Sequence, residues 1–164
     1  MVGSLAAGMP LGLAWWLVTP LARLENRADG VFAVGLTEEA AVAADGWFAA
    51  CAVVAGAVTA ALVAFFVHQR LAGLAGLAIG GVLGSVLAWR LGSLLGPPSI
   101  EASAVSARVG ARFDGPLDLS ALGVLLAWPM AAMVVYFAIV AGLDARRAHD
   151  SHEAPATQET EQQV

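Results

Sequence analysis

Four long stretches of the chain contain no charged residue, and each is 19 to 25 residues long: 2–22, 46–67, 71–89 and 119–143. About 20 consecutive apolar residues are enough for a helix to cross the hydrocarbon core of a bilayer. These stretches therefore predict an all-α membrane protein, a bundle of four transmembrane helices formed by residues 1–147.

Composition excludes several other classes of protein. Hydrophobic residues make up 59% of the chain and charged residues 13%, whereas a soluble domain has about 25% charged residues. The lone Cys51 cannot form an internal disulfide, and a net charge of −5 without a basic cluster argues against nucleic-acid binding. The first stretch is too long for a signal peptide and no basic residue precedes Arg23, so we expect it to be retained as a span.

Capping and stop signals indicate where the middle helices begin and end. The second helix is expected to begin near Thr37, a residue type that caps helix starts, and to continue to about Gln69. The link 68–70 is so short that the second and third helices must form an antiparallel hairpin. The third helix, 71–96, ends where a glycine is followed by two prolines.

The last part of the chain contains the fourth helix and a polar tail. The fourth helix, with its span at about 119–143, is expected to begin after Asp114, with this residue as its cap and Pro116 in its first turn. The tail 148–164 has almost no large apolar residue, so we expect it to be a separate, disordered acidic segment.

Residues 105–113 alternate between apolar residues and small or charged ones. A period of two is typical of a strand, and a lone strand is not stable without a partner. We expect the partner to be segment 31–36 in the first polar loop, so that a small extracytoplasmic strand pair caps the bundle.

Small residues recur every four positions in the third stretch, and such stripes let helices approach closely in a bilayer. The stripe consists of Ala72, Gly76, Gly80, Gly84, Ala88, Gly92 and Gly96. The second stretch has a matching series that includes Gly56, and the first has Gly8 and Gly12. The stripe predicts packing within one bundle; the alternative is a face for a second copy or another membrane protein.

Four residues at the expected outer ends of the second and third spans are candidates for interface and loop recognition. Trp47 and Trp89 are expected to anchor the helices at the membrane–water interface. Arg90 is expected either to extend its charge toward water or to pair with an outer carboxylate such as Asp45.

Two prolines, Pro10 and Pro129, lie inside the first and fourth stretches and are expected to kink those helices. None of the four stretches contains an ionisable Asp, Glu, Lys or Arg. Because such residues mark proton and ion paths inside membranes, their lack argues against an ion-coupled transporter acting alone.

Motifs that carry chemistry are missing from the sequence. It has no phosphate-binding loop, nucleophile elbow, pair of converging acids or H-E-x-x-H helix. His149 and His152 have a spacing that can hold a metal on a helix, but no third ligand lies near them in sequence. We therefore expect no enzymatic activity, no cofactor and no metal site.

The arginines are divided between the two expected sides of the membrane. An even number of spans places both termini on one side. The positive-inside rule counts basic residues in short flanks most strongly, and three arginines (Arg70, Arg146 and Arg147) lie in short flanks on the side of the termini. The longer loops of the other side carry five (Arg23, Arg27, Arg90, Arg108 and Arg112). The raw count opposes cytoplasmic termini, whereas the loop lengths favour them, and we expect both termini in the cytoplasm.

Several short motifs resemble those of one family. They are G-S-V-L-A-W-R-L-G-S-L-L-G-P at 84–97, A-D-G-W-F at 44–48, P-L-D-L at 116–119 and L-L-A-W-P at 125–129. In order and spacing they are similar to an actinobacterial family of small four-helix integral membrane proteins, known as a domain of unknown function, over residues 8–143. The resemblance implies cytoplasmic termini and no particular activity. The uncharged N-terminus and the single arginine in the 68–70 link depart from the family pattern.

Two functions remain open at this point. The first is a non-enzymatic plasma-membrane protein that works by helix packing and partner association, with loops 23–45 and 90–118 forming a recognition cap. Its expected partners are the lipid bilayer and itself or another membrane protein, through the small-residue faces. The alternative is a membrane subunit of a transporter or permease, in which the kinked first and fourth helices line a path.

Overall fold

The computed structural model describes residues 2–35, 37–67 and 69–161, and the side chains of residues 7–35, 39–67 and 69–149. In chain order the elements are α1 (Val2–Val18), β1 (Arg23–Arg27), β2 (Gly30–Ala33), α2 (Thr37–Phe66), α3 (Arg70–Leu95), α4 (Ile100–Ser106), β3 (Arg112–Asp114), the 3-10 helix η1 (Leu122–Leu126) and α5 (Ala127–Glu161).

Three segments are long and apolar enough to cross a bilayer: Glu39–Phe66 in α2, Arg70–Ser106 with α3, and Leu122–His149 with α5. These helices support the prediction of a multi-pass membrane protein. The described apolar part of α1, Ala7–Val18, is shorter, so the first predicted span is an apolar helix that falls short of this length.

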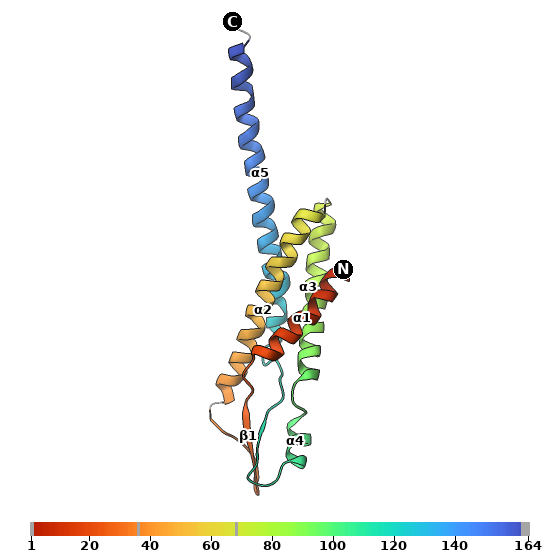
Figure 1. Cartoon of the computed structure of the whole chain (residues 1–164), viewed down its shortest axis with the longest axis vertical. Helices are drawn as coiled ribbons and strands as arrows, with labels where there is room; N and C mark the ends of the chain where they lie inside the picture. The colour runs from red at the N-terminus through yellow and green to blue at the C-terminus, as the bar shows by residue number, and fades with distance from the viewer. Residues whose placement is uncertain (1, 36, 68, 162–164) are drawn as a thin grey trace.

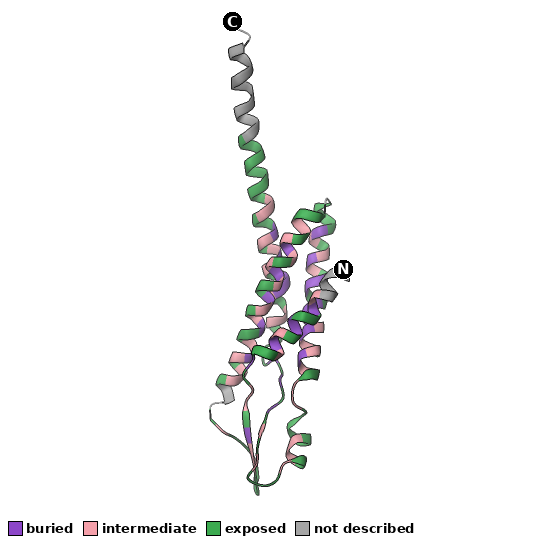
Figure 2. Cartoon of the chain, viewed as in Figure 1, coloured by how far each residue is buried: buried purple, intermediate pink, exposed green. Residues whose placement is uncertain are grey.

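The long helices form two pairs, because α1 packs along α3 and α2 packs along α5, while α3 and α5 touch between them (Figure 1). Aromatic side chains fill the centre: Trp15, Phe48 and Trp128 are fully buried, and the rings of Trp15 and Phe48 meet edge to face at 5.2 Å. Residues coloured as exposed lie mainly on the outward sides of the helices (Figure 2), as expected where lipid is the solvent.

A three-stranded antiparallel sheet of order β2-β1-β3 lies at one end of the bundle, together with α4 (Figure 1). Leu24 of β1 is opposite Ala33 on one side and Phe113 on the other. We call this end the sheet end, and the opposite end, where α2 finishes and α3 begins, the hairpin end. The sheet and α4 together (residues 23–33 and 100–114) are called the cap.

The predicted strand pair is wrong in its extent and its pairing. Residues up to Ser106 belong to α4, and within 105–113 only Arg112 and Phe113 lie in a strand. That strand, β3, pairs with β1, and the segment expected to be its partner contributes β2 on the other side of β1.

Side-chain hydrogen bonds explain why alternation was misleading here. The hydroxyl of Ser99 accepts from the N–H of Ala102 at 3.4 Å and caps α4. The side-chain amide of Asn26 donates to the carbonyl oxygens of Ala104 and Ala107, at 3.1 and 2.9 Å. These bonds satisfy carbonyls that a helix end leaves free, so this segment forms a short helix docked against β1.

The boundaries of the middle helices agree with the sequence, but those of the fourth do not. The second helix begins at Thr37 as predicted, and the third ends at Leu95, before the glycine. The fourth does not begin after Asp114: this residue ends β3, Leu117 and Leu119 are buried in an extended segment, and helical structure begins only with η1. The helix start was misplaced because this segment alternates buried and exposed residues, like a strand.

The final helix extends far beyond the bundle (Figure 1). α5 continues to Glu161, through most of the tail 148–164 for which the sequence predicts disorder. The side chains of 150–164 lie outside the described residues, and disorder in the tail stays a prediction.

Candidate functional site

α1 lies against α3 at distances that only small residues allow. A Cβ atom placed on Gly8 would lie 2.8 Å from the carbonyl oxygen of Gly84, and one placed on Gly12 would lie 2.6 Å from that of Ala88. Both separations are shorter than any real Cβ contact, so the two glycines are required for this approach. The result is a backbone-to-backbone contact of the kind that stabilises helix pairs in lipid.

The rest of the stripe is used unevenly. The indole of Trp15 occupies the space that a Cβ on Gly92 would need. Gly80 is buried, whereas a Cβ on Gly76 would meet open space. One side of the stripe is therefore filled by α1, and the part nearest the hairpin end is not.

The second pair of helices also meets through a small residue. A Cβ on Gly56 of α2 would lie 2.7 Å from the carbonyl oxygen of Trp128 on α5. The indole N–H of Trp128 donates to the hydroxyl of Thr59 at 3.2 Å. Among the described residues, the close glycine contacts that join the long helices are thus made within this one chain.

Asp45 attaches α2 to the segment that leads into α5. Its two carboxylate oxygens accept the backbone N–H groups of Ser120 and Ala121, at 3.0 and 3.1 Å, so it fixes the residues just before η1 to α2. Of the two alternatives expected for Arg90, pairing with Asp45 is not seen among the described residues, and extension of its charge toward water stays a prediction. The guanidinium of Arg90 instead lies over the ring of Trp89, 4.8 Å from its centre.

Two tryptophans predicted at the interface have different roles. The indole N–H of Trp89 donates to a carboxylate oxygen of Asp118 at 2.8 Å, which ties α3 to the same extended segment. Trp47 is about half exposed on α2. Asp45, Trp89 and Arg90 thus lie at the sheet end of the bundle, while Trp47 faces outward between α1 and α2.

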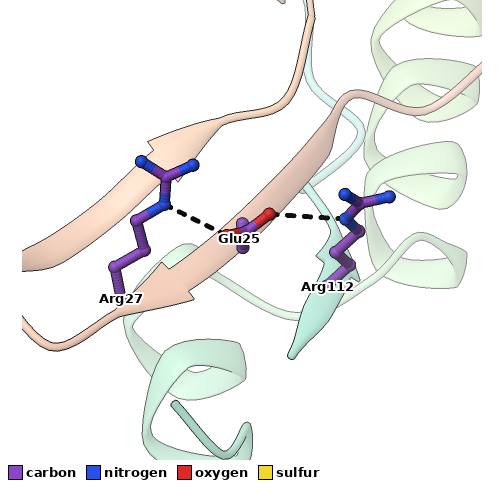
Figure 3. Close-up of polar contacts among 3 residues, drawn as sticks. All are labelled: Glu25, Arg27 and Arg112. Carbon is purple, nitrogen blue, oxygen red and sulfur yellow. Dashed lines mark hydrogen bonds and ion pairs between the residues drawn. The ribbon is translucent and has the colours of Figure 1, made fainter. Parts of the chain in front are cut away.

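Glu25 of β1 bonds to Arg27 on its own strand and to Arg112 on the neighbouring strand β3 (Figure 3). Its carboxylate lies 3.0 Å from Nε of Arg27 and 3.4 Å from Nε of Arg112. The hydrogen bond from Arg27, and then that from Arg112, holds the pKa of Glu25 below its ordinary value. The guanidinium of Arg27 also stacks on Phe32 at 5.4 Å. This group ties strand to strand and gives the cap a fixed shape.

The cap presents apolar side chains to its surroundings. Val105 is 89% exposed and Val109 is 70% exposed, and Arg108 between them is exposed too. The carbonyl contacts of Asn26 fix this segment to β1. Apolar groups that lie together on an ordered exposed segment form part of many binding surfaces.

A groove of about 670 Å³ runs between α1 and α2, and its walls are largely apolar. Pro10 and Trp47 lie along it, and the hydroxyl of Thr59 already donates to the carbonyl oxygen of Ala55 at 2.8 Å.

Pro129 is the third residue of α5, a position in the first turn where a backbone N–H has no partner within the helix, so the proline breaks no hydrogen bond of α5. The kinks predicted at the two prolines stay predictions.

At the hairpin end, Arg70 and Asp144 form a two-pronged ion pair with N–O distances of 2.9 and 2.8 Å. Arg147 approaches the same carboxylate at 3.7 Å, and the hydroxyl of Tyr136 donates to the carbonyl oxygen of Arg70 at 3.4 Å. This group fixes the start of α3 to α5.

Comparisons with protein-family models, with curated proteins and with solved structures found no match to this chain. Within the described residues, no group of three or more His, Cys, Asp or Glu side chains is placed to hold a metal ion.

Sequence reasoning missed three residues that organise the two ends of the bundle: Asn26, Asp118 and Asp144. A single asparagine in a strand gives no signal of its own. Asp118 and Asp144 each lie beside a predicted span, and a search for the polar residues nearest to span ends would have found them.

Proposed function

We propose that the protein is a plasma-membrane protein with four spans that works without enzymatic chemistry, by holding the cap in a fixed shape for a partner beside the membrane. α1 would be the fourth span, because it is apolar and runs parallel to α3, with Gly8 against Gly84 and Gly12 against Ala88. We also propose that it belongs to the four-helix family that it resembles, with both termini in the cytoplasm.

The observation that carries this proposal is the contrast between the filled stripe and the exposed cap. Gly8 and Gly12 cover much of the small-residue face of α3, so that face serves the bundle itself. Val105 and Val109 instead stand exposed on a segment that Asn26 holds in place. Binding surfaces combine such apolar groups with arginines, and the cap has both.

Affinity co-purification from native membranes tests the cap. A partner that crosslinks to the wild-type chain should be recovered in about tenfold lower amount with the double variant V105S/V109S. The control is V42S, which alters an exposed valine on α2 outside the cap and should keep the partner. Equal recovery with both variants would contradict the proposal.

The orientation is tested with a reporter that is active only outside the cytoplasm. Fused after residue 164, this reporter should be inactive. Activity there would place the termini outside. The transporter alternative gains no support from the groove beside Pro10, whose lining within the described residues carries no charged group.

A further inference from the structure

The hairpin end contains a second hollow with a different chemistry from the groove. It has a volume of about 380 Å³ and lies between α2, the start of α3, and α5. Arg70, Arg147 and Tyr136 line one part of it, and the rest is apolar, with Phe65 and Leu143 among the lining residues. A site with a cationic part and an apolar part suits a ligand that has both an anion and a hydrocarbon chain.

The charges at this hollow do not cancel. Among the described residues, no carboxylate lines the hollow, but Asp144 pairs with both of the arginines that do. Two guanidinium groups against one carboxylate leave one positive charge. Arg70 is also the first residue of α3, and the residue before it makes no side-chain cap bond, so the positive end of the helix dipole adds to the same field.

The depth of the hollow matches that of lipid headgroups. Phe66 and Leu71, on either side of the hairpin turn, are 76% and 84% exposed. Apolar side chains so exposed are stable against lipid and costly in water, so the turn lies at the boundary of the bilayer. The guanidinium of Arg70 is then at the level of phosphate groups, with the apolar wall extending toward the acyl chains.

We propose that this hollow binds the phosphate of an anionic phospholipid, with Arg147 and Arg70 as the cationic contacts and one acyl chain along the wall that includes Phe65 and Leu143. Basic hollows between membrane helices are known to bind acidic headgroups. The site depends only on the protein lying in a bilayer and not on the proposed role of the cap.

The test measures retention of phosphatidylglycerol by the full-length protein in detergent, using native mass spectrometry. R147Q removes one cationic contact and leaves the ion pair of Arg70 intact, and it should lower retention about fivefold. R146Q is the matched control, because it makes the same change on the adjacent residue, which does not line the hollow. Equal losses for R147Q and R146Q would reduce the effect to net charge and overturn the site.

D144N separates binding from a merely structural role for the ion pair. The variant raises the positive charge of the hollow, so phosphatidylglycerol retention should rise, while R70Q should lower it. If the ion pair only fastens α3 to α5, both variants would lower the thermal unfolding midpoint. Phosphatidylglycerol retention would then not rise in D144N and fall in R70Q, and the site would be refuted.

Two further probes separate the possible sources of the phosphate. Phosphatidylcholine with the same acyl chains should be retained several-fold less than phosphatidylglycerol, because its headgroup has no net negative charge. Inorganic phosphate at equal ionic strength should not displace the lipid. Displacement by inorganic phosphate at comparable concentration would mean that the acyl chain is not bound, and the assignment to a phospholipid would be wrong.

Discussion

The two sides of α1 face its neighbours in opposite ways. Toward α3, Gly8 and Gly12 bring backbones so close that no Cβ fits between them. Toward α2, an open groove of about 670 Å³ separates the helices over much of their length, and they meet through the indole N–H of Trp15, which donates to the carbonyl oxygen of Ala44 at 2.9 Å. The positions of Gly8 and Gly12 therefore mark the side of α1 that packs tightly against the bundle.

The largest effect is expected from filling the tight side. G12L places a side chain where the carbonyl oxygen of Ala88 lies, so it should lower the stability of the bundle in detergent by about 3 kcal/mol. G76L makes the same change where a Cβ meets open space and should leave the thermal unfolding midpoint nearly unchanged. Equal midpoints for both variants would refute the contact of α1 with α3.

A smaller effect is expected at the polar bond across the loose side. W15F keeps an aromatic ring against Gly92 but removes the donor to Ala44, which should cost about 1 kcal/mol. W16F, on the neighbouring and less buried tryptophan, should cost less. Chemical denaturation of the two variants in the same detergent gives the comparison, and a larger loss for W16F would show that the bond to Ala44 contributes little.

The cap should respond to acid, whereas the contacts of α1, which involve no ionisable group, should not. The pKa of Glu25 is held below its ordinary 4.5 by Arg27 and then Arg112. A carboxylate with a lowered pKa stabilises the fold above its ordinary pKa, and that stabilisation is lost as the pH falls through the folded-state value. Hydrogen exchange of β1 and β3 should therefore speed up below about pH 4.5, after correction for the pH dependence of intrinsic exchange.

The control for this acid response is E25Q. Its strands should exchange faster than those of the wild type at neutral pH and should show little further change in acid. Because the arginines are exposed, solvent weakens these pairs, and the effect is expected to be local to the sheet. Equal acid sensitivity in wild type and E25Q would assign the response to another group.

The smallest effect is expected from adding volume to the loose side. V58L extends a side chain into the groove, where free space accepts it, so stability should change by no more than about 0.5 kcal/mol. If V58L instead lowers the free energy of thermal unfolding by about 2 kcal/mol or more, then α1 and α2 lie closer together than the groove implies.

The long helices could be placed from the sequence because the signal is local. An uncharged run shows its own length, and the stop after α3 lies within the same few residues. The cap could not be placed in this way. Its form depends on bonds between distant residues, such as Asn26 to Ala104 and Glu25 to Arg112, which are 78 and 87 positions apart. Alternation within one segment contains no record of such partners.

The candidate site was predictable in part for the same reason. The spacing of Gly84, Ala88 and Gly92 predicts a packing face, but it could not identify α1 as the helix that lies against Gly84 and Ala88. Asp45 and Trp89 were recognised as residues at the ends of spans, yet their partners lie in the 116–121 segment. That segment was misread as the beginning of a helix.

The parallel contact between α1 and α3 has a consequence for how the chain is made. Gly12 meets Ala88, a residue that leaves the ribosome 76 positions later. α1 is therefore made before its partner exists, and it must wait while α2 and then α3 are made. During that interval its two glycines lack the backbone that they contact in the folded chain, and α5 must still follow before the bundle is complete.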